Sequence, residues 1–467
     1  MGVSNLADWT PHSDVPIQAE PDATEAIPVA QADDASASNR LGFFPDEPLT
    51  REQTGLSATE IESLILKLLL NCGVATGRAI SEHIRLPFAV IKIELASLKI
   101  QLLVSYRDGA PMNDYEYELT ELGVARARRR AEVCTYFGAA PVRMPKYIEA
   151  IEKQSIGNAT PRLADLQRAF ADLQLPQAVI SQIGQAVNAG KSLFLYGAPG
   201  NGKTCIAERV IRAVSEYIWI PKCVTVTDEI IRVYDPSMHE EVPLVDESKD
   251  DQLLESLKID RRWVRIRRPT IVTGGELTLD MLECKLNPAT GINEAPLQLK
   301  SNGGALIIDD FGRQRMSTTE LLNRWIVPLE KGYDYLTLRS GRHLEVPFAQ
   351  LLVFSTNLDP RDIVDEAFLR RIPYKIEVFD PTEEEYCRLF LNLARKMGFA
   401  FSDDIVDFLL ERHYRKQKRP LRYCHARDLL LQVKNLNEFH ELPMQITEMA
   451  LDVAAYNYFA GLSVDHS

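Results

Sequence analysis

A glycine-rich loop of eight residues, at positions 197–204, constrains the fold of this chain more than any other feature. It reads Gly-Ala-Pro-Gly-Asn-Gly-Lys-Thr and directly follows an apolar, strand-like segment at 192–196. Glycines allow consecutive backbone N–H groups to turn inward around phosphate oxygens, because a Cβ atom would block both the turn and the approach. With a strand before it and a helix expected after it, the loop predicts a phosphate-binding unit within an α/β domain.

The individual positions of this loop have distinct chemical roles. Lys203 is expected to neutralise the β- and γ-phosphates of ATP, and the Thr204 hydroxyl is expected to bind Mg²⁺. The N-terminus of the following helix adds the positive end of its dipole. The predicted nucleotide-binding residues are therefore Gly197, Ala198, Pro199, Gly200, Asn201, Gly202, Lys203, Thr204 and Cys205.

A second strand-like segment supplies two carboxylates. The apolar run 304–308 is followed directly by Asp309 and Asp310. A carboxylate in this position can hold Mg²⁺ through water, and its neighbour can orient or deprotonate the attacking water. Alone, such a run is equally compatible with an ordinary strand end. Together with the loop, it predicts that Thr204 and Asp309 hold the metal and that Asp310 is catalytic.

The charge of the chain is unevenly distributed along its length. Residues 1–50 contain nine acidic residues and one arginine, so they carry −8 of the total net charge of −13. This segment is also rich in Ala, Pro and Ser, and we expect a disordered acidic tail. The remaining chain is predicted to form four parts: a domain at 51–135, a linker at 136–165, an α/β core at 166–380 with an insertion near 224–301, and a helical lid domain at 381–467.

Residues 51–135 predict three helices followed by a β-hairpin. Apolar residues recur at helical spacing over 61–69 and 88–98, with a short helical segment between them. Two strands, at 102–107 and 115–119, are joined by a turn of Gly, Pro, Asn and Asp. Alternation in the second strand predicts one buried set of side chains: Tyr115, Tyr117 and Leu119. This arrangement resembles the winged-helix domains of bacterial regulators.

The core and the segment after it resemble the AAA+ ATPase family, from about residue 166 to the lid helices. The resemblance implies that Asp309 is the Mg²⁺-associated Walker B aspartate. The following position is usually Glu in active members and is Asp310 here, which implies slow hydrolysis because the shorter acid shifts its reach by one methylene. Asn357, in the segment Phe-Ser-Thr-Asn-Leu, matches the sensor-1 residue that helps to hold the attacking water.

Three arginines match family positions that contact nucleotide. The segment Ala-Phe-Leu-Arg-Arg-Ile-Pro places Arg371, or alternatively Arg370, where an arginine finger acts on ATP of the neighbouring subunit. In the lid, His-Ala-Arg-Asp-Leu-Leu places Arg427 where sensor 2 contacts the γ-phosphate. The alternative for each is a surface or salt-bridging arginine. A finger from a neighbour makes every ATP site a subunit interface, so the resemblance implies a homo-oligomer, a hexameric ring.

A second hairpin is predicted between Asp310 and Asn357. Strands at 335–338 and 344–346 flank the turn Ser-Gly-Arg. This element resembles the pre-sensor-1 β-hairpin of the AAA+ branch that includes MoxR-like ATPases, enhancer-binding activators and several unfoldases. The alternative is an ordinary surface hairpin.

The charge pattern bears on the choice between nucleic-acid and protein partners. A basic run with an aromatic residue, compatible with nucleic-acid binding, lies in the predicted insertion: Arg261, Arg262, Trp263, Arg265, Arg267 and Arg268. Acidic residues a few positions upstream favour ion pairing instead. Residues 51–135 contain eleven basic and eleven acidic residues, whereas DNA binding requires a positive excess. We therefore expect a protein partner, with DNA as the alternative.

The cysteine pattern and the hydropathy of the chain indicate its cellular compartment. The seven cysteines are scattered without a C-x-x-C pair, which is typical of a reduced cytoplasmic protein. No run of about 18 apolar residues is present, so no membrane span is expected.

Overall fold

The computed structural model describes residues 43–460 apart from Gln174, Asp228, 244–257, Arg339 and Asp403, and apart from the side chain of Ala367. Most of the predicted acidic tail therefore lies outside the described residues. The acidic stretch of the insertion, from Asp246 to Glu255, also lies outside them.

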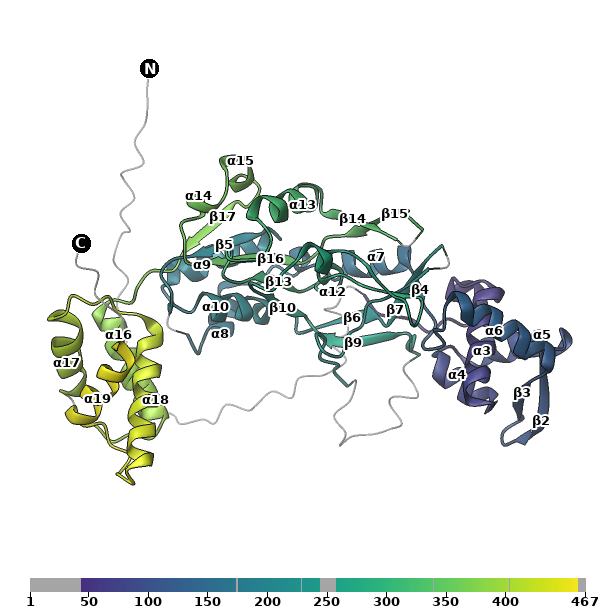
Figure 1. Ribbon diagram of the computed structural model, residues 1–467, viewed down its shortest axis with the longest axis horizontal. Coiled ribbons are helices and arrows are strands. Elements are labelled where there is room, and N and C mark those ends of the chain that lie inside the picture. The colour runs from purple at the N-terminus through teal and green to yellow at the C-terminus, as the bar shows by residue number, and fades with distance from the viewer. Residues whose placement is uncertain are drawn as a thin grey trace, which may run out of the picture. The chain divides into compact units, whose positions relative to one another are not determined.

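A five-stranded parallel sheet forms the centre of the fold (Figure 1). Its strands lie in the order β10 (Thr270–Thr273), β13 (Ala305–Ile308), β16 (Leu351–Thr356), β5 (Leu193–Tyr196) and β17 (Tyr374–Glu377). All neighbouring pairs are parallel. β5, which precedes the glycine-rich loop, lies between β16 and β17, and β13 precedes the two aspartates. This arrangement confirms the predicted α/β fold, with the glycine-rich loop directly after a central strand.

Helices cover both faces of the parallel sheet. Alternate residues of each strand point to opposite faces, so both faces present apolar side chains that need to be covered. Leu193 and Leu195 pack in one hydrophobic cluster and Phe194 in another. The first face is covered by α8 (Leu163–Ala169), α9 (Gln177–Asn188) and α10 (Lys203–Val210). The second is covered mainly by α13 (Thr318–Lys331), the short α12 (Leu297–Lys300), α14 (Pro360–Ile363), α15 (Glu366–Leu369) and the turn η4 (Leu279–Leu282). β5 is therefore a fully enclosed strand that holds the start of the loop rigidly.

The N-terminal region combines helices with a three-stranded antiparallel sheet of order β1-β3-β2. Its elements are α2 (Arg51–Thr54), α3 (Ala58–Cys72), β1 (Val74–Thr76), α4 (Gly77–Ile84), α5 (Phe88–Ile100), β2 (Val104–Ala110), β3 (Asp114–Leu119) and α6 (Glu121–Val133). The predicted helices and hairpin are present, whereas β1 was not expected. Tyr117 is buried as predicted, but Tyr115 is 43% exposed.

The predicted linker at 136–165 differs from the structure. It forms β4 (Val142–Arg143), α7 (Met144–Lys153) and the 3-10 turn η2 (Ile156–Asn158), and Tyr147 of α7 is completely buried. Pro145, which suggested a connector, lies in the first turn of α7. Proline is tolerated there because that backbone position needs no N–H donor.

The predicted insertion contributes most of a second sheet, to which the predicted linker adds β4. Its strand order is β11 (Lys285–Asn287), β12 (Ile292–Glu294), β8 (Glu229–Arg232), β7 (Cys223–Val226) and β4, and a separate antiparallel pair joins β6 (Tyr217–Pro221) to β9 (Trp263–Arg267). The range 224–301 also contains β10 of the central sheet. The insertion is therefore not one continuous block, because the chain returns to the core at residues 270–273.

The basic run 261–268 is largely internal. The Arg262 side chain is fully buried, forms an ion pair with Asp260, and donates hydrogen bonds to the carbonyls of Thr54 and Pro141. Arg268 is also buried, and Arg267 pairs with the surface acids Glu216 and Glu240. Ion pairing, the expected alternative to nucleic-acid binding, is present at Arg262 and Arg267, with acids that lie outside the 246–255 stretch.

The last residues of the predicted tail pack against the body. Phe43 is buried, with its ring centroid 5.0 Å from that of Trp263, and the Asp260 N–H donates to the Pro45 carbonyl at 2.8 Å. The tail prediction was therefore wrong for residues 43–50, because aromatic contacts of Phe43 and Phe44 and backbone hydrogen bonds to residues 258–260 hold this segment.

The predicted second hairpin is formed by β14 (Tyr333–Thr337) and β15 (His343–Pro347). Leu336 and Val346 are buried in a cluster that also contains Tyr147 of α7. One face of this hairpin therefore packs against the second sheet and α7.

The C-terminal part is helical and has its own hydrophobic core. It consists of α16 (Glu383–Lys396), α17 (Ile405–Leu410), η5 (Glu411–Arg415), α18 (Tyr423–Phe439) and α19 (Glu448–Phe459). Among the described helices, none combines the length and apolar character needed to cross a membrane.

Candidate functional site

Three glycines of the loop have backbone conformations that other residues rarely adopt. Gly197, Gly200 and Gly202 all have positive φ angles, of 132°, 85° and 78°. A Cβ atom on Gly197 would lie 2.4 Å from the Val378 carbonyl oxygen, and one on Gly200 would lie 2.5 Å from the Cys424 sulfur. Only glycine fits at these two positions, so the loop has the backbone freedom and space that a bound phosphate requires.

Lys203, the first residue of α10, lies at the centre of the site. Its Nζ donates hydrogen bonds to the carbonyls of Gly197 and Ala198, at 2.9 and 3.0 Å, and to Oδ1 of Asn357 at 2.7 Å. Burial lowers the pKa of the Lys203 ammonium below its ordinary value, and the nearby Asp309 and Asp310 oppose that shift. A positive charge is therefore held between the loop and the two carboxylates.

Thr204 and Asp309 form the predicted metal-binding pair. The Thr204 hydroxyl donates a hydrogen bond of 2.8 Å to Oδ2 of Asp309, which follows β13. A hydroxyl and a carboxylate are hard oxygen ligands of the kind that Mg²⁺ prefers. The donor set therefore fits the predicted metal, one oxygen coming from the loop helix and one from the adjoining strand end.

Asn357 connects Lys203 to Asp310. It follows β16, and its Nδ2 donates to Oδ1 of Asp310 at 3.2 Å while its Oδ1 accepts from Lys203. Lysine can only donate and a carboxylate can only accept, so these two contacts fix the orientation of the amide. Asp310 is exposed and has a φ of 48°, a conformation that aspartate tolerates better than most residues. The structure thus brings together five residues predicted from sequence.

A second set of contacts beside the loop was not predicted. Asp380, just after β17, accepts a hydrogen bond of 2.7 Å from Nδ2 of Asn201 and forms an ion pair with Arg422. The Cys424 N–H, in the first turn of α18, donates to the Gly200 carbonyl at 3.0 Å. Asp380, Arg422 and Cys424 are far from the loop in the chain, and no local sequence pattern marked them as its neighbours. They connect the loop to the C-terminal helices.

Arg427 is placed differently from Arg422. It is exposed on α18, and no hydrogen bond or ion pair joins it to another of the residues that the structure describes. The arginine that faces the loop in this conformation is Arg422, whose charge also lowers the pKa of Lys203, after the larger effect of burial.

Arg370 and Arg371 lie at the opposite edge of the sheet from the loop. They precede β17, and the first residue of that strand, Tyr374, is in register with Leu193 at the start of β5. The loop follows the other end of β5, roughly 10–13 Å away at 3.3 Å per residue. Nε and Nη2 of Arg371 both contact Oε1 of Glu330 at 2.6 Å, and its side chain is 25% exposed.

Arg370 is the more exposed of this pair and forms an ion pair with Glu366. Both arginines line a cavity of about 510 Å³ together with Glu330 and Pro373. Both arginines are separated from the loop of their own chain by the length of β5.

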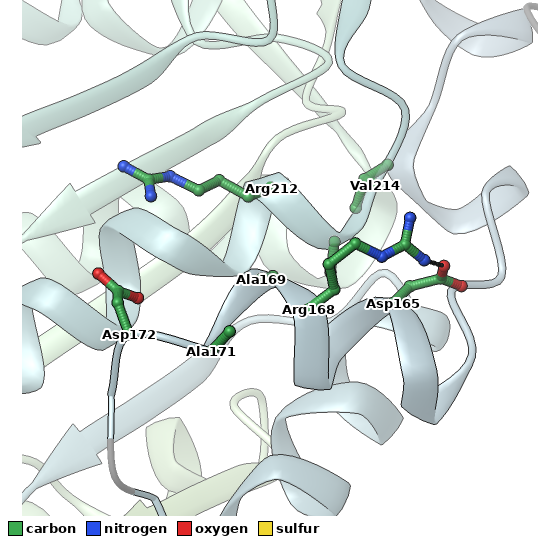
Figure 2. A pocket seen from close by; sticks show the side chains of 8 residues that line it. Asp165, Arg168, Ala169, Ala171, Asp172, Arg212 and Val214 are labelled. Carbon is green, nitrogen blue, oxygen red and sulfur yellow. Dashed lines mark hydrogen bonds and ion pairs between the residues drawn. The ribbon is translucent and has the colours of Figure 1, made fainter. Parts of the chain in front are cut away.

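Another cavity, of about 540 Å³, lies between α8 and the turn η3 (Ile211–Ala213) (Figure 2). Charged side chains surround it, and Figure 2 shows Arg168 paired with Asp165, a contact of 2.6 Å. It lies at the C-terminal end of the α10–η3 segment, whereas the phosphate loop is at the N-terminal end. This hollow is therefore not part of the phosphate site.

Comparisons with known proteins match parts of this chain. The model of the family DUF8689, described as a domain of unknown function, matches residues 382–457, which span α16–α19. No curated protein shows significant sequence similarity to the chain.

The similar solved structures include those of RuvB and NtrX. RuvB of Thermotoga maritima, described as a Holliday junction branch migration motor, is 14% identical over 63% of this chain and 73% of its own, with a TM-score of 0.35. NtrX of Brucella abortus in complex with ATP is 12% identical over 64% of this chain and 62% of its own, with a TM-score of 0.38. These values are too low to assign an activity to the chain.

Proposed function

We propose that this chain is an ATPase of the AAA+ type, which binds ATP with Mg²⁺ at the 197–204 loop and hydrolyses it. The observation that carries the proposal is the network formed by Lys203, Thr204, Asp309, Asp310 and Asn357. The ends of β5, β13 and β16, which are far apart in the sequence, bring these groups together at one edge of a parallel sheet. Ligands of open α/β sheets bind at that carboxyl edge.

Each group has a role in phosphoryl transfer. When ATP binds, the Lys203 ammonium donates its hydrogen bonds to phosphate oxygens in place of the loop carbonyls. The loop N–H groups bind the same phosphates. Thr204 and Asp309 would hold Mg²⁺, which would neutralise part of the negative charge on the β- and γ-phosphates. Asp310 accepts a proton from the attacking water or orients it, and Asn357 keeps Asp310 in place through the amide contact.

Asp310→Asn tests this assignment directly. We expect the variant to bind ATP as the wild type does but to hydrolyse it about a hundredfold or more slowly, because only the general base is lost. Steady-state ATPase rates and ATP titrations measure the two quantities. Asp280→Asn, at an exposed acid of η4, is the matched control and should leave both unchanged. An unaltered rate in Asp310→Asn would remove Asp310 from the mechanism.

The Asp310→Glu variant should hydrolyse ATP faster than the wild type, because the longer side chain brings the carboxylate closer to the attacking water.

We further propose that the active form is a homo-oligomeric ring in which Arg371 acts on the ATP of the neighbouring subunit. The position of Arg371, across the sheet from its own loop, supports action between subunits. A guanidinium suits this role because it stays charged and presents a planar fork to phosphate. Arg370 is the second candidate, and Glu330 holds Arg371 in position within the subunit.

The C-terminal helices are proposed to act as a lid that senses the γ-phosphate. Arg427 is the candidate from sequence and Arg422 is the candidate beside the loop, where Asp380 holds it. We expect Arg422→Ala to weaken ATP binding about tenfold and ADP binding much less, because a contact with the γ-phosphate exists only for ATP.

Isothermal titration with ATP and ADP measures this difference for both lid arginines. Arg427→Ala is expected to change neither affinity in this conformation. The reverse result, selective loss of ATP affinity in Arg427→Ala alone, would restore Arg427 as the sensor and contradict the assignment of Arg422. Equal losses for both nucleotides would make either arginine structural.

We also propose that residues 51–135 form a winged-helix module that recruits a protein partner for remodelling or regulation. The order of helices and strands from α3 to α6, including β1, supports this topology. Equal numbers of acidic and basic residues in the module favour a protein over DNA. A DNA-binding regulatory factor is the alternative, and salt-titrated binding of duplex DNA to the full chain tests it.

A further inference from the structure

The third helix of the N-terminal region, α5, has an apolar stripe on its solvent side. Ala89, Ile93, Ala96 and Ile100 are all exposed, and their i, i+4, i+7, i+11 spacing places them on one face. Ile93 is 67% exposed and Ile100 is 84% exposed. The opposite face of α5 fills the hydrophobic core of the region. α5 is thus apolar on both faces, which is typical of a helix that packs against something on each side.

A pair of lysines and a pair of tyrosines continue this surface. Lys92 and Lys99 are exposed one heptad apart beside the stripe, and the Lys99 Nζ lies 3.2 Å from the centre of the Tyr106 ring. Tyr106 of β2 stacks on Tyr115 of β3, with ring centroids 4.2 Å apart, and both rings are partly exposed. α5, β2 and β3 can be followed in Figure 1. We call the following residues the α5 surface: Lys92, Ile93, Lys99, Ile100, Tyr106 and Tyr115.

The charge balance of the N-terminal region favours a protein over DNA. Residues 51–135 contain eleven basic and eleven acidic residues, whereas binding of a phosphate backbone requires an excess of neutralising cations. The exposed isoleucines offer no hydrogen bond to a base edge or a phosphate.

We propose that the α5 surface binds an amphipathic helix of a partner protein whose apolar face covers Ile93 and Ile100 and whose acidic flank pairs with Lys92 and Lys99. This inference rests on the proposed recruitment of a protein by residues 51–135 and names the chemistry of that partner. The apolar stripe supplies binding energy at helical spacing, and the two lysines select the charge of the flank and its direction.

The test uses the full chain without nucleotide, so that its outcome is independent of ATP hydrolysis. The probe is a fluorescent amphipathic helix of about 18 residues, or five turns, with leucines on one face and glutamates on one flank. A matched probe carries lysines in place of the glutamates. We expect the glutamate probe to bind at least about tenfold more tightly than the lysine probe, as measured by fluorescence anisotropy.

Three variants make this test specific to the α5 surface. Ile93→Glu with Ile100→Glu should weaken binding of the glutamate probe by at least about tenfold, since truncated apolar anchors dominate such interfaces. Lys92→Glu with Lys99→Glu should reverse the preference between the two probes. Met449→Glu, at an exposed apolar residue of α19, is the control and should bind as the wild type does.

Several outcomes would overturn the proposal. Equal affinity for both probes, or unchanged binding in the isoleucine variant, would show that the surface does not recognise an acidic helix. Duplex DNA that binds through Lys92 and Lys99 would assign the surface to nucleic acid. Self-association of the chain that disappears in the isoleucine variant would assign it to a second copy of this chain.

Discussion

Lys203→Ala is expected to reduce ATP affinity by about a hundredfold or more and to abolish hydrolysis. The Lys203 ammonium lies within the loop, and each charge-assisted hydrogen bond to a phosphate contributes about 1.5–3 kcal/mol. Alanine removes that charge and leaves the glycine loop to bind phosphate through neutral N–H groups alone. ATP titration by calorimetry and steady-state ATPase assays measure the two losses.

Two controls separate a loss of binding from a loss of folding. Lys285→Ala removes an exposed lysine of β11 and should leave affinity and rate unchanged. Thermal unfolding of Lys203→Ala should show a cooperative transition, because the carbonyls of Gly197 and Ala198 lie beside the phosphate cradle and not in the apolar core. Wild-type ATP affinity in a folded Lys203→Ala protein would contradict the nucleotide site at this loop.

Arg371→Ala is expected to lower turnover by about a thousandfold, the scale of an arginine finger, while ATP still binds. Mixing this variant with Lys203→Ala subunits should restore activity. The first variant supplies an intact loop and the second supplies Arg371, so one interface in four is competent in a random equimolar ring. We therefore expect about a quarter of the wild-type rate.

Arg370→Ala is the matched control for this experiment, because its guanidinium pairs with Glu366 on the surface. It should retain most of the wild-type rate. If the Arg371 and Lys203 variants stay inactive in every mixture, Arg371 does not act between subunits. A defect of Arg370→Ala that is rescued by the same mixing would transfer the role to Arg370.

Local signals were sufficient to select several of the residues that meet at the candidate site. Gly197 and Gly200 need positive φ angles that the sequence pattern already implies, and Asp309 follows an apolar run of strand length. Asn357 was predicted only through resemblance to a family, and its contacts with Lys203 and Asp310 are now explicit. These residues follow strands whose order in a parallel sheet brings their ends together.

The parts that sequence did not predict depend on contacts between distant segments. Arg422 and Asp380 form a pair 42 residues apart, and nothing in either local sequence marks the other. Pro145 was interpreted as part of a connector, but the burial of Tyr147 under the second sheet holds a helix there. The sequence of the basic run at 261–268 could not show which of its arginines are buried. Arg262 is buried because carbonyls from segments more than a hundred residues earlier in the chain surround it.

The order of strands in the central sheet also has a consequence for how the chain folds. β5 has two neighbours, and their register pairs are Leu193 with Val353 and Leu193 with Tyr374. During synthesis this apolar strand is therefore made long before either partner, and such late, non-local pairing slows folding and exposes an aggregation-prone segment. We therefore expect slow refolding from this topology. A nascent chain that ends before residue 351 lacks both neighbours of β5 and so has no completed sheet to support the 197–204 loop.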